Sequence, residues 1–172
     1  MLAGSTCFAL DADEIAALVK KPHDREGLAE EMKFFPDVRK YTAELEMGKP
    51  GEEATKINDI TVEEKTVEGK YIVSVLKHPD PQQPKITMVV SYDKEEGVYR
   101  KWIVLPGGGV AEAIGAVVPK TKTISWFPLN KFDGVSAFGT EHHTDDLVRW
   151  KEVLIKDGKV VGINRGMAKK VK

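Results

Sequence analysis

The segment Glu141-His142-His143-Thr144-Asp145-Asp146 gathers the side chains that most readily bind metals or transfer protons. Two imidazoles and a carboxylate would suit Zn²⁺ or another transition metal. Successive residues of a strand point to opposite faces, however, so His142 and His143 would not share one ion. Asp145-Asp146 has the composition of a turn. We therefore predict no metal site here, and we favour His142 alone as a residue that faces a cavity.

Other catalytic motifs are missing from the sequence. Gly107-Gly108-Gly109 would need a following helix with a lysine and a hydroxyl to cradle a phosphate, and Val110-Ala-Glu-Ala-Ile114 follows instead. No Gly-x-Ser-x-Gly, Cys-x-x-Cys or His-Glu-x-x-His motif occurs. The single cysteine, Cys7, has no base close to it in the sequence. We predict no catalytic residue, and an enzyme is the less favoured interpretation.

Composition limits the class of protein. The chain has 172 residues, of which 41% are hydrophobic and 31% charged, as in an ordinary globular domain. A net charge of -1 creates no field that would attract nucleic acid. One cysteine cannot form an intrachain disulfide, and no apolar run reaches the roughly 20 residues of a membrane span. Met1–Ala12 could be the tail of an export signal but lacks a positively charged start. We therefore favour the cytoplasm over an exported or periplasmic location.

Two short helices are predicted before residue 38. Asp11 and Glu14 have the spacing of a capping box, and an amphipathic segment follows them until Pro22. Leu28, Met32 and Phe35 have helical spacing in a second segment from about residue 25 to 34. Two short helices cannot form a core alone. Residues 1–37 are therefore interpreted as a lead-in that packs on the rest of the chain.

From residue 38 to 172 the hydrophobic period is two, which is typical of strands. Asn58-Asp59 shifts the parity of the second strand, which predicts a β-bulge. Asp157-Gly158 predicts a two-residue hairpin turn with positive φ angles. The connections are short, so neighbouring strands must be antiparallel, and closing the sheet would remove its two open edges. The fold class is therefore mainly β: an up-and-down meander closed into a barrel of about eight to ten strands.

Three short motifs resemble those of a known family: Glu68-Gly-Lys-Tyr71, Val90-Ser-Tyr-Asp93 and Tyr99-Arg-Lys-Trp102. The segment from Trp150 through Asp157-Gly-Lys159 to Arg165 follows in the same order. These segments resemble those of the bacterial calycin-like proteins of unknown function, which are related to lipocalins. The Gly-x-Trp of the first lipocalin strand is absent, and Tyr41 stands near its place. The resemblance implies an up-and-down barrel whose mouth admits a small apolar ligand, and it implies no activity.

The function predicted from the sequence is the binding of a small, largely apolar or amphiphilic ligand inside this barrel. An arginine on a late strand, Arg149 or Arg165, could meet a carboxylate of the ligand. An enzyme that uses the interior as a reaction chamber, and a filled structural barrel, are the alternatives. No cofactor is predicted, because haem would need one axial histidine and His78, His142 and His143 are equal candidates. The candidate ligand-binding residues are Tyr71, Met88, Tyr99, Trp102, Trp126, Phe138, His142, Trp150 and Arg165.

Overall fold

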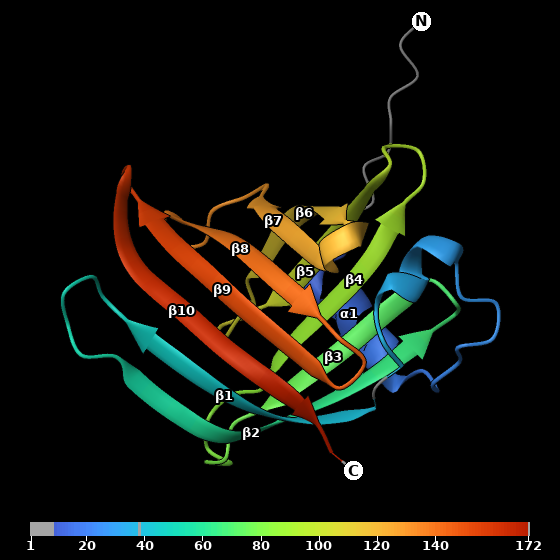
Figure 1. Ribbon diagram of the computed structural model, residues 1–172, viewed down its shortest axis with the longest axis horizontal. Coiled ribbons are helices and arrows are strands. Elements are labelled where there is room, and N and C mark those ends of the chain that lie inside the picture. Colours follow the sequence, from blue (N-terminus) through green and yellow to red (C-terminus); the bar gives the residue numbers. More distant parts are fainter. Residues whose placement is uncertain (1–8, 38, 172) are drawn as a thin grey trace, which may run out of the picture.

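The computed structural model describes residues 9–37 and 39–171, and these form a barrel with short helices at its N-terminal end (Figure 1). Among the described residues there are ten strands, one α-helix and two 3₁₀ helices. The helices are α1 (Ala12–Lys20), η1 (Glu30–Phe34) and η2 (Pro119–Thr121). The strands are β1 (Lys40–Gly48), β2 (Thr55–Val67), β3 (Tyr71–Lys77), β4 (Ile86–Asp93), β5 (Val98–Val104), β6 (Val110–Val118), β7 (Thr123–Pro128), β8 (Val135–His143), β9 (Leu147–Lys156) and β10 (Lys159–Lys170).

Every strand pairs antiparallel with the next one along the chain, and β1 pairs with β10 to close the barrel. Ala43 of β1, for example, lies opposite Ala168 of β10 and opposite Ile60 of β2. Closure leaves no open sheet edge to attract another strand. The predicted closed meander is confirmed.

Two local features, one predicted from strand parity and one from turn chemistry, are also confirmed. The register of β1 and β2 shifts between Ala43 and Leu45, opposite the Asn58-Asp59 pair, and Asp59 has a φ of 60°. The β9–β10 hairpin turns at Asp157 and Gly158, whose φ angles of 49° and 73° are those of a primed two-residue turn. A second register shift, between Val160 and Gly162, has no signal in the sequence that we recognised.

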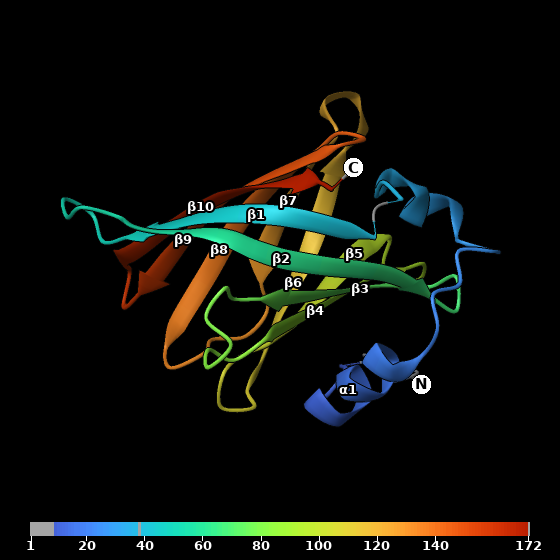
Figure 2. The ribbon, with the colours of Figure 1, turned by 90° about the horizontal axis from the view of Figure 1, so that it is seen from below.

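Helix α1 lies on the outside of the barrel, across β2–β5 (Figure 2). The Asp11 side chain accepts from the amides of Asp13 and Glu14, and Glu14 closes the capping box as predicted. Ile15 and Leu18 are buried against Val67, Val73, Val89 and Trp102. At the other end of α1, Lys65 donates to the carbonyls of Val19 and Lys21, where a cation complements the helix dipole.

The second helix is shorter than predicted and closes one end of the barrel. It is a 3₁₀ helix over Glu30–Phe34, because Gly27 takes a φ of 76° and the Ala29 amide donates to Gly69 rather than to a helical carbonyl. Met32 is completely buried there. The Tyr99 hydroxyl donates to the Glu31 carbonyl at 2.6 Å and fixes the segment in place. The interior at this end is therefore filled by side chains of the lead-in.

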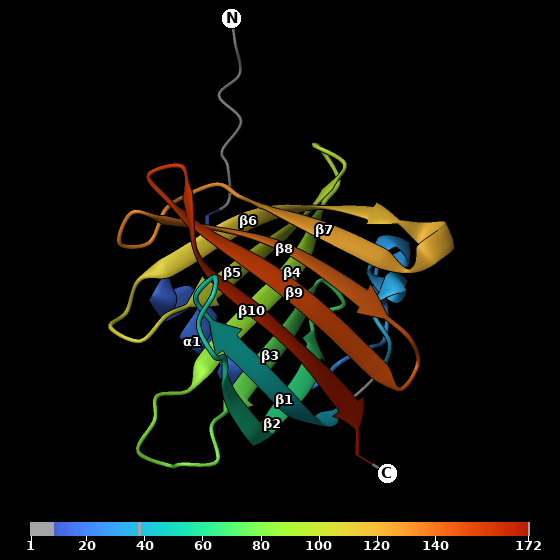
Figure 3. The same ribbon diagram turned by 60° about the vertical axis from the view of Figure 1, so that its left-hand side comes forward.

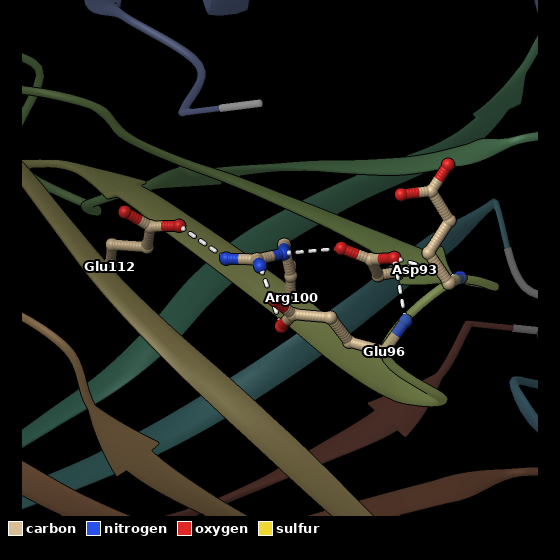
Figure 4. Close-up of polar contacts among 5 residues, drawn as sticks. Asp93, Glu96, Arg100 and Glu112 are labelled. Atoms are coloured by element: carbon tan, nitrogen blue, oxygen red, sulfur yellow. Dashed lines mark hydrogen bonds and ion pairs between the residues drawn. The ribbon is translucent and has the colours of Figure 1, made fainter. Parts of the chain in front are cut away.

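The outer face carries one buried cation, Arg100 of β5 (Figure 4). Its guanidinium contacts Asp93 at 3.0 Å, Glu96 at 2.9 Å and Glu112 at 3.2 Å. The hydrogen bond from Arg100 holds the pKa of Asp93 below its usual range. These contacts connect the β4–β5 hairpin to β6, so the cluster has a structural explanation.

Met1–Phe8, which contain Cys7 and most of the segment considered as an export signal, lie outside the described residues. Val38, where the first strand was predicted to begin, also lies outside them. Among the residues that the structure describes, no helix has the length and apolarity to cross a membrane.

Candidate ligand-binding cavity

A cavity of about 400 Å³ occupies the barrel interior on the side of β5–β9. Its size lies within the range of small-molecule sites. The lining combines a majority of apolar side chains with a few charged and amide groups. The lining residues are Lys101, Ile103, Leu105, Ala111, Glu112, Ala113, Trp126, Pro128, Asn130, Phe132, Asp133, Val135, Ala137, Gly139, Glu152, Leu154 and Asn164.

Small inward-facing residues explain why this side is hollow. On β6, Ala111, Ala113 and Gly115 face the interior opposite Ile103, Lys101 and Tyr99. On β8, Ala137 and Gly139 occupy the inner face. A Cβ on Gly115 would lie 2.6 Å from the Trp126 ring, so glycine is needed there for the indole to lie across β6. Alternation of Ala and Gly with larger outer residues therefore creates space on two strands.

The rim of the cavity is formed by two connections, residues 105–109 and 129–134. Asn130 joins them to β6, because its Oδ1 accepts from the Glu112 amide at 2.8 Å and its Nδ2 donates to the Val110 carbonyl at 2.9 Å. Phe132 lies against Gly109, where a Cβ would come within 2.3 Å of the ring. The glycine run that could be mistaken for a phosphate loop therefore serves as a close packing surface for an aromatic ring.

A single row of inward-facing residues crosses the floor of the cavity from β7 to β10. Trp126 lies opposite Gly139, Gly139 opposite Glu152, and Glu152 opposite Asn164. The Asn164 amide donates to the Glu152 carboxylate at 3.3 Å. The buried Nε1 of Trp126 has no hydrogen-bond partner among the described residues. The row thus places an indole and a carboxylate on either side of Gly139 in the cavity wall.

Lys101 connects the cavity to a buried polar network. Its ammonium group lies 4.1 Å from the centre of the Trp126 ring and forms an ion pair with Glu141. The other oxygen of Glu141 lies 3.2 Å from Nε2 of His143. Burial alone would raise the pKa of Glu141, but Lys101 and His143 outweigh burial and hold that pKa at about 2. Lys101 therefore already has a buried counter-ion.

A second carboxyl group, Glu64 of β2, lies partly buried on the same inner face. The Ser74 hydroxyl donates to it at 3.1 Å. Burial raises the pKa of Glu64 to about 8, since Ser74 and Arg25 compensate only part of the desolvation. Burial also raises the pKa of Tyr41, and that of Tyr99 to about 12. The interior thus contains both a charged and a protonated carboxyl group near neutral pH.

The structure distributes the predicted ligand-binding residues over both faces of the barrel. Of these nine, Trp126 lines the cavity, and Met88, Tyr99 and Trp150 share its inner face elsewhere in the barrel. Tyr71 and Trp102 lie on the outer face beneath α1. Phe138 is on the outer face and 40% exposed. The remaining two, His142 and Arg165, also lie outside.

The histidine that faces the interior is His143 and not His142. His142 is exposed and lies opposite Arg149 on the outer face, whereas His143 is buried against Phe34 and Phe35 with ring centres 5.3 Å and 5.2 Å away. His142 and His143 lie on opposite faces of β8, as predicted from the alternation of strand residues. Alternation alone does not say which of the two points inward.

The two late-strand arginines do not meet a ligand in the interior. The Arg165 side chain is 63% exposed and pairs with Glu46 at 2.6 Å beside a hollow of about 260 Å³ on the outer surface. Arg149 is likewise exposed on the outer face. In the described part of the chain, no group of three His, Cys, Asp or Glu side chains could hold a metal ion.

The chain folds into a closed antiparallel barrel of ten strands with a cavity on one side. Two solved structures are similar to it. A protein of unknown function of the DUF3598 family from Nostoc punctiforme has a TM-score of 0.58 at 9% identity, over 88% of this chain and 50% of the other. An S-type phycobiliprotein lyase from Guillardia theta has a TM-score of 0.55 at 16% identity, over 88% of this chain and 99% of the other. This chain thus spans half of the first protein and nearly all of the second.

These likenesses concern the fold alone, because the sequence identities are low. No family model matches the chain, and no curated protein matches its sequence.

Proposed function

We propose that the protein binds a small, largely apolar molecule inside its barrel. The observation that carries the proposal is the cavity of about 400 Å³, whose wall is mainly apolar and contains only a few polar groups. Such a combination is typical of small-molecule sites, in which apolar surface contributes affinity and polar groups set orientation. A phycobiliprotein lyase has a similar barrel fold. The proposal rests on the cavity of this chain and not on that likeness.

Trp126 is the ligand contact that we propose from both the sequence and the geometry. It is buried and lines the cavity, whereas Trp102 is buried on the outer face beneath α1. A ligand in the cavity should therefore change the emission of Trp126 and leave that of Trp102 unchanged.

The test is a fluorescence titration with a panel of small phenylalkyl amphiphiles. Saturable change is expected in the wild type and in Trp102→Phe, and it should disappear in Trp126→Phe. Calorimetry with the same compounds checks that binding itself persists when the reporter is removed. If no compound of the panel gives a saturable signal by either method, the proposal is wrong.

A further inference from the structure

We propose that the cavity selects ligands that carry a protonated amine, and that the carboxylate of Glu152 is the counter-charge. This inference rests on the proposed function, which it refines by naming the head group.

The charges of the wall are unbalanced. Lys101 is the one cation in the lining, and Glu141 neutralises it. Of the three acidic residues in the lining, Glu112 pairs with Arg100. The other two, Asp133 and Glu152, form no ion pair among the described residues. The wall therefore presents two uncompensated carboxylates to whatever enters, and a site lined by one sign of charge attracts the opposite one.

Glu152 has the position that a head-group partner requires. It belongs to the row that crosses the cavity floor, where Gly139 lies between it and Trp126 and adds no side chain of its own. Among the described residues, the hydrogen-bond partner of this carboxylate is the neutral amide of Asn164, at 3.3 Å. A carboxylate has about four acceptor positions, so most of its capacity is left for a donor on the ligand. Asp133 lies at the rim and extends the negative field outward.

An anionic ligand would have to overcome this arrangement. To reach a carboxylate of the ligand, Lys101 would have to leave Glu141, and a mostly buried carboxylate that loses its ammonium partner is destabilised. Glu152 and Asp133 would in addition repel the incoming anion. The two arginines that could have replaced Lys101, Arg149 and Arg165, lie outside the barrel. The same wall therefore disfavours an acid and favours an amine.

The experiment compares three ligands that share one apolar body: 4-phenylbutylamine, 4-phenylbutan-1-ol and 4-phenylbutanoate. Affinities are measured by calorimetry and Trp126 fluorescence at about pH 7, where amine and carboxylate are charged. We expect the amine to bind about tenfold more tightly than the alcohol, because a hydrogen bond between charged groups is stronger than a neutral one. The carboxylate should bind most weakly of the three.

Variants assign the selectivity to residues. Glu152→Gln should reduce amine affinity about tenfold and leave alcohol affinity unchanged. Asp133→Asn should reduce amine affinity only about twofold, because a charge at the rim acts through the long-range field. Asparagine tolerates the φ of 49° at this position, so the backbone should not change. Glu95→Gln, in the exposed β4–β5 turn at the other end of the barrel, is the matched control and should change nothing.

The outcomes separate the two proposals. Equal affinities of the three ligands, or tighter binding of the carboxylate, would overturn the amine inference and leave the proposed function standing. Absence of binding by all three, together with a negative result for the wider panel, would overturn both. If Glu152→Gln does not fold, the salt dependence of binding to the wild type tests the inference. Amine affinity should decrease between about 50 and about 500 mM NaCl, while alcohol affinity should not change. Equal salt dependence of the two affinities would reject the inference.

Discussion

The interior of the barrel has a filled half and a hollow half, built from the same alternating strands. In the filled half, Met32 of η1 and Phe35, which follows it, are inserted between the strands, and Tyr41, Ala43 and Ile60 form a packed cluster beside them. In the hollow half, alanine and glycine line β6 and β8 and leave about 400 Å³ open. Stability is therefore concentrated in one half and the capacity to bind in the other, and substitutions should affect the two properties separately.

The largest expected effect is on the filled half. Phe35→Ala removes a buried ring from the closed end and should reduce the free energy of unfolding by about 3–5 kcal/mol. Val135→Ala, at the rim of the cavity, should cost only about 1 kcal/mol, because that side chain is partly exposed. Urea denaturation followed by circular dichroism measures both. Equal losses would mean that the two halves contribute equally to stability.

A comparable effect is expected where the two halves meet. Lys101→Met removes the ammonium partner of Glu141, a mostly buried carboxylate that then keeps only His143, and should destabilise the fold by about 3 kcal/mol. Replacing both partners, Lys101→Met with Glu141→Leu, should recover most of the loss. Lys94→Met in the exposed β4–β5 turn is the control, with a change within about 0.5 kcal/mol. A double variant as unstable as the single one would contradict this explanation.

A pH dependence of a few kcal/mol is expected from Glu64 in the filled half. Its pKa rises from 4.5 in the unfolded chain to about 8 in the fold. The folded state therefore holds the proton more tightly, so this contribution to stability is fully present below pH 4.5 and is lost as the pH rises through about 8.

Denaturation curves across that pH range measure the loss. Glu64→Gln should show a smaller decrease than the wild type, because glutamine needs no proton to remain neutral. Glu63→Gln is the matched control, since Glu63 points outward and pairs with Lys77. The same decrease in all three proteins would assign the effect to another group.

The smallest change in stability is expected when side-chain volume is added. The same substitution, Ala→Leu, can be made in both halves, so the halves are compared directly. Ala43→Leu forces a larger side chain into a packed cluster and should cost about 1–3 kcal/mol. Ala137→Leu adds the same atoms to the cavity wall and should change stability by less than about 1 kcal/mol. Ligand affinity should instead decrease about tenfold in Ala137→Leu, by calorimetry with 4-phenylbutan-1-ol, because the added side chain occupies the ligand's space. Unchanged affinity would place the ligand elsewhere.

Much of the fold followed from the sequence, because strand periodicity and turn chemistry are local signals. The closed meander, the bulge at Asn58-Asp59 and the turn at Asp157-Gly158 all depend on neighbours within a few residues. The second helix was less well predicted. The spacing of Leu28 and Met32 predicted an α-helix, but the segment forms a short 3₁₀ helix, because Gly27 has a positive φ and the Ala29 amide donates to the Gly69 carbonyl.

The site was harder to predict, because alternation does not say which face is the inside. On β3 and β5 the residues of both faces are buried, since α1 covers the outer side. Large aromatic residues such as Trp102 and Tyr71 therefore looked like cavity lining while packing under a helix. The useful signal was the small residues on the inner faces of two strands, Ala111, Ala113 and Gly115 of β6 and Ala137 and Gly139 of β8, which mark the side on which the interior is left open.

The position of α1 also makes the barrel wall uneven in thickness. Across β2–β5 the sheet is backed by a helix, whereas no described helix covers β7–β10, and Phe127 and Phe138 are exposed there (Figure 3). Amide protons of β7 and β8 should therefore exchange with solvent sooner than those of β3 and β4. The strands β7–β9, which form much of the cavity wall, are therefore the part of the barrel with the least support from outside.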